Sequence, residues 1–348
     1  MKVLMTGVDK SRLGGMWTVS NNYITSKEYN DKVDLTYVAT STSGSILKRV
    51  LCMLKGFLKV KRELKSKKYD IVHIHMAEKG STYRASYIVN LATKYKTKVI
   101  IHMHAGPFMA WYDTLNEKKK NRIKEMFEKT TKVLALGDYW KKQLEALIDG
   151  KKIEVLYNGV AIPENNKYDS DSKNIIYMGV LKKEKGIFDL INAVKYIDEK
   201  LEKSITFKFC GIDLEGNIQE TIKNMQLQDR IKLVGWVSGN EKEKLMRNAM
   251  ISILPSYFEA LSMTVIEAMS YGIPVITTDI STMNEVLDNK EQLITPGDSV
   301  ELGNKILDMV NSENKRKQIS KKEYDRCKTS FSIENNIGKT LEIYENLK

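Results

Sequence analysis

The chain has 348 residues, a length that favours two domains over one. Its content of 42% hydrophobic and 29% charged residues is typical of a globular protein and excludes a fibrous or disordered chain. No apolar run approaches 18 residues, which argues against a membrane-spanning helix. The three scattered cysteines fit neither a disulfide framework nor a zinc motif. The apolar stretch within residues 1–8 is too short for a signal peptide. We therefore expect a cytoplasmic protein.

Positive charge is concentrated in the first half of the chain. Residues 1–165 carry 30 Lys and Arg residues against 16 Asp and Glu residues, a net charge of +14. Residues 166–348 have a net charge of −2. This asymmetry predicts a polyanionic partner for the first half alone.

Short β-branched apolar runs alternate with longer helix-period segments along the whole chain. Because the runs are almost continuously apolar, we expect parallel strands that helices cover on both faces. The pattern predicts an α/β fold with two doubly wound, Rossmann-like sheets. In chain order the expected strands are 3–6, 35–39, 71–75, 99–102, 133–136 and 153–156, then 175–178, 205–210, 231–234, 251–254, 275–277 and 292–294.

The alternation breaks once, in the polar segment 164–174, which we interpret as a linker. It divides the chain into an N-terminal domain of residues 1–165 and a C-terminal domain of residues 166–330. We expect the two similar halves to face each other across a cleft that holds the ligand. The apolar spacing in residues 331–348 predicts a final helix.

Paired glycines, Gly14 and Gly15, stand in the loop after the first expected strand. Glycines in this position allow the backbone to approach a ligand closely. The full G-x-G-x-x-G pattern is absent, so the sequence does not support a nicotinamide-dinucleotide site.

Residues 46–69 combine an apolar stripe at helical spacing with many lysines and arginines. A basic amphipathic helix of this kind can lie on an anionic membrane. The simpler interpretation, which we favour for the stripe, is that it packs into the core. For the positive charge we favour a functional role. The stripe consists of Leu47, Val50, Leu51, Leu54, Phe57, Leu58 and Leu64.

The four histidines fall in two pairs, His73 with His75 and His102 with His104. Each pair has the spacing that places both side chains on one face of a strand, near its carboxyl end. No carboxylate or cysteine accompanies them, so we predict no zinc site. We expect structural roles for His73 and His102, and we take His104 as the candidate for contact with a sugar.

The loop after the expected strand 175–178 begins at Gly179 and ends at Lys185 and Gly186. A helix follows directly. A lysine beside helix N–H groups can stabilise a departing diphosphate without a metal. Taken alone, this pattern also fits a solvated lysine loop.

Two carboxylates, Glu259 and Glu267, flank the start of a helix after the expected strand 251–254. A strand–loop–helix of this kind directs backbone N–H groups and acceptor side chains to one point beyond the strand. The flanks of Glu267 are apolar, so we expect a buried carboxylate that needs a partner. A pair of ribose hydroxyls would satisfy it.

Together these residues resemble the retaining glycosyltransferases of family 4, which have the GT-B fold, and among them the bacterial branch that builds surface polysaccharides. The E-x7-E motif matches at Glu259 and Glu267, and the glycine loops follow in the family's order. The resemblance covers nearly the whole chain. It implies a last helix, 331–348, that crosses back to the first domain.

The resemblance implies that the second domain binds a nucleotide-sugar donor. Glu267 would hold the ribose hydroxyls, Glu259 the sugar hydroxyls, and Lys185 the leaving diphosphate. The first domain would hold the acceptor, with His104 near the transferred sugar. The remaining donor contacts expected are Gly14, Gly15, Gly179, Ala260, Leu261, Ser262 and Met263.

Two positions depart from the family's pattern. Val180 stands where the family usually has arginine, so Lys182 or Lys183 would have to replace that donor. Ala260 stands where the family usually has glycine.

We therefore expect a retaining glycosyltransferase that uses a glycan or lipid-linked glycan acceptor and lies on the inner face of the cytoplasmic membrane. No metal or other cofactor is implied, because no Asp-x-Asp pair follows an expected strand. Two alternatives remain open: a sugar-nucleotide epimerase of the same fold, and a catalytically weak nucleotide-sugar-binding partner. A nucleic-acid partner is not expected, because no recognised motif accompanies the positive charge.

Overall fold

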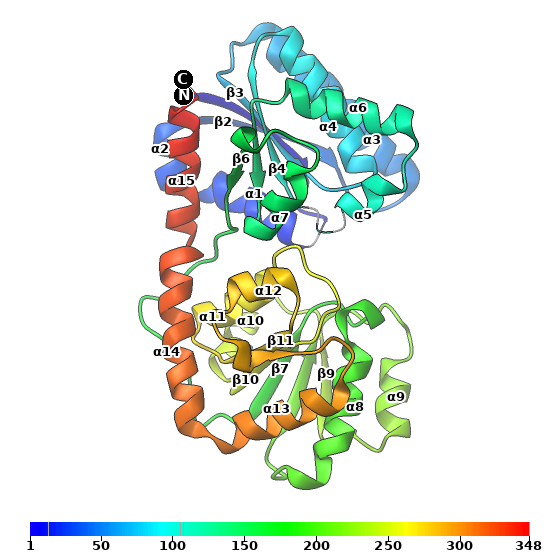
Figure 1. Cartoon of the computed structure of the whole chain (residues 1–348), viewed down its shortest axis with the longest axis vertical. Coiled ribbons are helices and arrows are strands. Elements are labelled where there is room, and N and C mark those ends of the chain that lie inside the picture. The colour runs from blue at the N-terminus through cyan, green and yellow to red at the C-terminus, as the bar shows by residue number, and fades with distance from the viewer. Residues whose placement is uncertain (13, 105, 107, 348) are drawn as a thin grey trace. The chain divides into compact units, whose positions relative to one another are not determined.

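A computed structural model describes residues 1–348 apart from positions 13, 105, 107 and 348 (Figure 1). The chain divides into two compact units, which we call unit 1 (Met1–Gly159 with Ile333–Lys348) and unit 2 (Val160–Ser332). Within the described residues, each unit contains one six-stranded sheet in which all paired strands are parallel. The predicted α/β fold with two doubly wound sheets is confirmed.

The sheet of unit 1 has the order β2-β1-β3-β4-β5-β6. Every expected strand in this half is present, with small shifts at the ends. The strands β3 and β4 are almost wholly buried, as parallel strands covered on both faces should be. The bounds are β1 Lys2–Val8, β2 Asp34–Ser41, β3 Ile71–Met76, β4 Lys98–Met103, β5 Lys132–Ala135 and β6 Ile153–Val155.

Helices flank the sheet of unit 1, and the last helix of the chain, α15, packs beside α2 (Figure 1). The hydroxyl of Tyr344 on α15 lies 3.2 Å from that of Tyr29. Tyr344 is fully buried, so α15 is anchored by an aromatic side chain whose polar end has a partner. The helices are α1 Gly15–Thr25, α2 Lys27–Lys32, α3 Ile46–Ser66, α4 Gly80–Lys94, α5 Phe108–Asp113, α6 Glu117–Lys129, α7 Asp138–Glu145 and α15 Ile333–Glu345, with a short 3-10 helix at Gly150–Lys152.

The sheet of unit 2 has the order β12-β11-β10-β7-β8-β9. All the strands expected in this half are present. They are β7 Asn174–Met178, β8 Thr206–Cys210, β9 Ile231–Gly235, β10 Ile251–Leu254, β11 Val275–Thr278 and β12 Leu293–Ile294. The helices are α8 Ile187–Ile197, α9 Ile218–Asn224, α10 Gly239–Arg247, α11 Met263–Ser270, α12 Ser281–Val286, α13 Ser299–Asn311 and α14 Glu313–Ser330, with 3-10 helices at Lys183–Lys185, Asp198–Lys200 and Lys290–Gln292.

The polar segment 161–173 belongs to unit 2 and contains neither helix nor strand in this described stretch. The buried guanidinium of Arg316 on α14 donates hydrogen bonds to the Tyr168 hydroxyl at 3.1 Å and to the Ser170 carbonyl at 3.2 Å. Charge-assisted hydrogen bonds therefore fix the segment to unit 2 before β7 begins.

Most of the apolar stripe of α3 lies outside the core, so our interpretation was wrong for Leu47, Val50, Leu51, Leu54 and Leu58, whereas Leu64 is buried as expected. Ile46, Leu47 and Leu58 are 77%, 70% and 68% exposed. The helix instead turns its narrow opposite face to β2. There Gly56 lies so close that an added Cβ would meet the Ala39 carbonyl oxygen at 2.7 Å. The small Gly56 permits this close packing, which leaves the larger apolar side chains in solvent.

Among the described residues, no helix is both long and apolar enough to span a bilayer.

Candidate active site

The strand order of unit 2 reverses between β7 and β10. The chain leaves β7 toward β8 on one side, whereas β10 lies on the other side of β7. In open parallel sheets, ligands bind at such a reversal, beyond the carboxyl ends of the strands. The two loops that leave β7 and β10 carry the motifs that the sequence singled out, residues 179–186 and 255–263.

The loop after β7 rests directly on the loop after β10. Gly186, with φ of +69°, ends the first loop, and an added Cβ there would lie 2.0 Å from the Pro255 carbonyl oxygen. The Tyr257 amide also donates a hydrogen bond of 3.0 Å to the Glu184 carbonyl. Only glycine combines this backbone conformation with so close an approach, and it sets the position of Lys185.

Lys185 and Glu259 meet across this junction. The Lys185 Nζ atom lies 2.6 Å from Glu259 Oε1, and their side chains are 25% and 10% exposed. The Ser256 hydroxyl donates a second hydrogen bond, of 2.8 Å, to the same oxygen. A cation and a carboxylate are thus fixed at the strand reversal, which is the chemistry that a diphosphate and a sugar hydroxyl require.

The residues Leu261 to Met263 form the start of α11. The Ser262 hydroxyl accepts a hydrogen bond of 3.4 Å from the Val265 amide and caps the helix, and no acidic residue lies in its first turn. The positive end of the helix dipole at α11 is therefore not neutralised by an acidic side chain of its own first turn. Ala260, between Glu259 and Leu261, is half-buried.

Glu267 points from α11 to a partner that the sequence did not reveal. Its flanking residues are buried, as predicted, but its Oε2 atom lies 2.6 Å from Nζ of Lys242 on α10. The carboxylate thus has a partner, as a buried carboxylate requires, but that partner is Lys242 of the same unit. The pairing depends on the packing of α10 beside α11, and no local pattern around Lys242 signals it.

Gly179 also lies where the backbone is tightly packed. A Cβ added to Gly211, after β8, would meet the Gly179 carbonyl oxygen at 1.7 Å. Next to Gly179, the Val180 carbonyl accepts a hydrogen bond of 2.8 Å from the Tyr177 hydroxyl. Lys182 pairs with Glu184 at 3.6 Å near the surface. Neither contact brings a second cation to the Lys185–Glu259 pair.

Gly14 and Gly15 lie in unit 1, at the start of α1. Gly14 has φ of +132°, a conformation that favours glycine, and an added Cβ would meet nothing within 4 Å. Both glycines line a pocket of about 430 Å³ between the loops that follow β1 and β3. The backbone at Gly14 is thus open to the pocket, and a ligand contact here stays a prediction.

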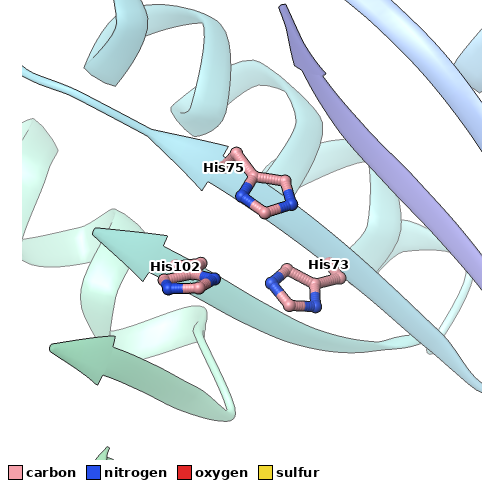
Figure 2. A group of neighbouring side chains, drawn as sticks. All are labelled: His73, His75 and His102. Atoms are coloured by element: carbon pink, nitrogen blue, oxygen red, sulfur yellow. The ribbon is translucent and has the colours of Figure 1, made fainter. Parts of the chain in front are cut away.

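The four histidines form one cluster at the carboxyl ends of β3 and β4, and Figure 2 shows three of its rings. The Nδ1 atom of His75 lies 2.8 Å from Nε2 of His104, and Nδ1 of His73 is hydrogen-bonded to the Tyr344 hydroxyl. Burial lowers the pKa of all four, that of His73 to about 3. The rings are therefore neutral, and His73 and His102 are fully buried.

Neutral imidazoles can bind a metal, and the free nitrogens of His73, His75 and His102 lie within 4.8 Å of one another. In a tetrahedral zinc site, ligand nitrogens are roughly 3.4 Å apart. At a separation of 4.8 Å, the histidine rings would have to move toward each other before their nitrogens could share one ion. That no metal binds here stays a prediction.

Residues 161–326 match the family Glycosyl transferases group 1, and residues 24–162 match Glycosyltransferase Family 4. An uncharacterized 41.2 kDa protein in the cps region of Klebsiella pneumoniae is 27% identical over 95% of this chain and 96% of its own length. The UDP-Gal:alpha-D-GlcNAc-diphosphoundecaprenol alpha-1,3-galactosyltransferase of Escherichia coli is 27% identical over 68% of this chain and 65% of its own.

Among solved structures, Anabaena Alr3699/HepE in complex with UDP and glucose is similar, with a TM-score of 0.77 and 16% identity. The match covers 99% of this chain and 100% of that one. At this identity the likeness shows the fold. The chain is therefore a glycosyltransferase of GT-B fold, in which a domain matching Glycosyltransferase Family 4 precedes one matching Glycosyl transferases group 1.

Proposed function

We propose that this glycosyltransferase moves a sugar from a nucleotide-sugar donor to a lipid-linked glycan, with retention of configuration, during synthesis of a cell-surface polysaccharide. The observation that carries the proposal is the Lys185–Glu259 pair at the strand reversal of unit 2. The names of the relatives support it. One lies in a cps region, one uses UDP-Gal and a diphosphoundecaprenol-linked acceptor, and the similar structure contains UDP and glucose.

In this proposal Glu267 accepts hydrogen bonds from the ribose hydroxyls. The Lys242 ammonium pairs with Oε2 of that carboxylate in the free protein, so the donor competes with Lys242 for it. The backbone from Leu261 to Met263 then approaches the diphosphate, whose charge the start of α11 favours. Gly179 and Ala260 complete the proposed donor contacts in unit 2, whereas Gly14 and Gly15 line a separate pocket of unit 1.

Transfer breaks the bond between the anomeric carbon and the diphosphate oxygen and forms one to the oxygen of the acceptor hydroxyl, whose proton passes to the departing diphosphate. Negative charge develops on the departing diphosphate, where Lys185 stabilises it without a metal. Glu259, released from Lys185, accepts hydrogen bonds from the sugar hydroxyls. We assign the neutral His104 to contact with the transferred sugar, since burial keeps its pKa below the ordinary value.

The exposed apolar face of α3 supports a membrane-bound acceptor. Leu47, Leu51, Leu54 and Leu58 are exposed on a helix rich in lysine and arginine. Apolar residues beside positive charge favour insertion into an anionic interface. We propose that α3 holds the enzyme on the inner face of the cytoplasmic membrane.

A thermal-shift screen over UDP-, GDP-, ADP- and CDP-sugars tests the donor assignment. One nucleotide class should stabilise the wild type, and Glu267→Ala should lose that shift. Glu243→Ala, a surface carboxylate paired with Arg247, is the matched control and should respond like the wild type. If no nucleotide stabilises the protein, or if Glu267→Ala responds unchanged, the donor site lies elsewhere.

A further inference from the structure

Unit 1 has its own strand reversal. The chain leaves β1 toward β2, whereas β3 lies on the other side of β1. The pocket of about 430 Å³ opens at this point, between the loops that follow β1 and β3. Open parallel sheets place ligands at such a reversal. Among the described residues that line the pocket are four basic side chains and two glycines, namely Arg12, Gly14, Arg49, Lys79, Gly80 and Arg84.

Three guanidinium groups converge on the pocket from different elements. Arg12 follows β1, Arg49 lies on α3, and Arg84 lies on α4. Burial and the charges of the other two arginines lower the pKa of Arg84. Arg84 is half-buried and has no hydrogen bond or ion pair with any described residue. Like charges held this close destabilise one another unless an anion joins them.

The pocket itself contains few groups that offset the positive charge of the three arginines. Glu78 also lines it, yet no ion pair joins Glu78 to an arginine within the described chain. The Arg12 guanidinium donates a hydrogen bond of 3.0 Å to the Ser41 hydroxyl, a neutral group that does not offset its charge. The site therefore keeps a strong net positive charge.

Two helices also begin at the pocket, α1 at Gly15 and α4 at Gly80. Neither has a side-chain cap or an acidic residue in its first turn. The amides of Trp17, Thr18, Ser81 and Thr82 donate hydrogen bonds to the carbonyls of Gly14, Glu78 and Lys79, and both helix dipoles present their positive ends. Planar guanidinium groups and the positive ends of helix dipoles together favour phosphate oxygens.

The surface beside the pocket is apolar. Arg49 is flanked along α3 by the exposed Leu47 and Val50. A neighbouring hollow of about 600 Å³ is lined by Leu47, Leu51, Lys48 and Lys55, among others. A ligand with a diphosphate joined to a hydrocarbon chain would match both surfaces.

We propose that this pocket binds the diphosphate of a lipid-linked acceptor, with the lipid chain along the exposed face of α3. The inference rests on the proposed function and adds to it the chemical class and the site of the acceptor. The diphosphate of the donor has the same chemistry. The adjoining apolar face favours the lipid source, because a nucleotide offers nothing to cover it.

Calorimetric titration of the full chain with farnesyl diphosphate, and separately with UDP, tests the proposal. Arg84→Gln and the exposed Arg49→Gln should each weaken farnesyl diphosphate binding by about tenfold, since each removes charge-assisted hydrogen bonds. Binding of UDP should not change. Arg122→Gln, an exposed arginine of α6, is the matched control and should bind like the wild type.

Inorganic diphosphate supplies a third titration. Leu47→Ser should weaken farnesyl diphosphate binding and leave inorganic diphosphate unaffected, because only the lipid touches the apolar face of α3. Unchanged farnesyl diphosphate affinity in Arg49→Gln and Arg84→Gln overturns the proposal, as does an absence of binding by the wild type. Weaker UDP binding in these variants would assign the pocket to the donor instead. UDP binding that depends on Glu267 would leave the donor proposal standing in either case.

Discussion

The Nζ atom of Lys185 lies 2.6 Å from the Glu259 carboxylate, across the strand reversal of the second sheet. Each group neutralises the other in the free protein. The ion pair therefore holds a cation and a hydrogen-bond acceptor in fixed positions, and we propose that the donor binds both groups. Such fixed groups stabilise developing charge with little reorganisation.

Replacing Lys185 should impair the chemical step more than donor binding. We expect Lys185→Ala to lower turnover about 100-fold, the usual effect of removing one group that stabilises transition-state charge. Initial rates of nucleoside diphosphate release measure it. The exposed Lys195→Ala on α8 is the matched control. Equal rates in Lys185→Ala and the wild type would remove Lys185 from the mechanism.

Replacing Lys242 should help the donor to bind. Its ion pair with Glu267 is partly exposed, so breaking it costs up to about 1 kcal/mol. Lys242→Ala removes that cost, and we expect nucleotide affinity to rise by up to about fivefold. Titration calorimetry with the stabilising nucleotide measures the change. Weaker binding would mean that Lys242 itself touches the nucleotide.

The exposed face of α3 should determine membrane binding. We expect the wild type to float with vesicles that contain anionic lipid and not with neutral vesicles. The double variant Leu47→Ser, Leu58→Ser should bind at least about tenfold more weakly, because two leucines lose apolar contact. Leu214 of unit 2 is 62% exposed, so Leu214→Ser controls for the loss of an exposed leucine outside α3. Equal flotation of all three proteins would contradict the role of α3.

Glu323 should make the stability of the protein depend on pH. This carboxyl group is buried against Gln292 and Val275, and burial raises its pKa to about 8. The unfolded group titrates near 4.5, so its contribution is complete below pH 4.5 and is lost as pH rises through about 8.

Denaturant unfolding at pH 6 and pH 9 tests this assignment. Since one pKa unit corresponds to about 1.4 kcal/mol, the wild type should lose at least about 1 kcal/mol more than Glu323→Gln over this interval. Parallel losses in the two proteins would show that Glu323 is ionised in the fold at both pH values.

The sequence predicted the strands and the loops that follow β7 and β10 because their signals are local. The β-branched runs, the glycine at Gly186 and the carboxylate spacing of Glu259 and Glu267 all lie within short segments. Each reflects a requirement of the backbone or of one strand–loop–helix unit.

The features that the sequence did not predict depend on packing between elements. Lys242 stands 25 positions before Glu267, on another helix. The convergence of Arg12, Arg49 and Arg84 likewise joins three separate segments. For α3, periodicity identified an apolar face, but close packing at Gly56 decided which face met the sheet.

Transfer of labelled sugar from the stabilising nucleotide-sugar to a polyprenyl-diphosphate-linked glycan, measured in the presence of EDTA, tests the central claim most directly. We predict a lipid-extractable product whose anomeric configuration matches that of the donor. Lys185→Ala and Glu267→Ala should strongly reduce its formation, and Lys195→Ala should leave it unchanged. Absence of a lipid product, inversion of the anomer, or full activity in Glu267→Ala would contradict the account.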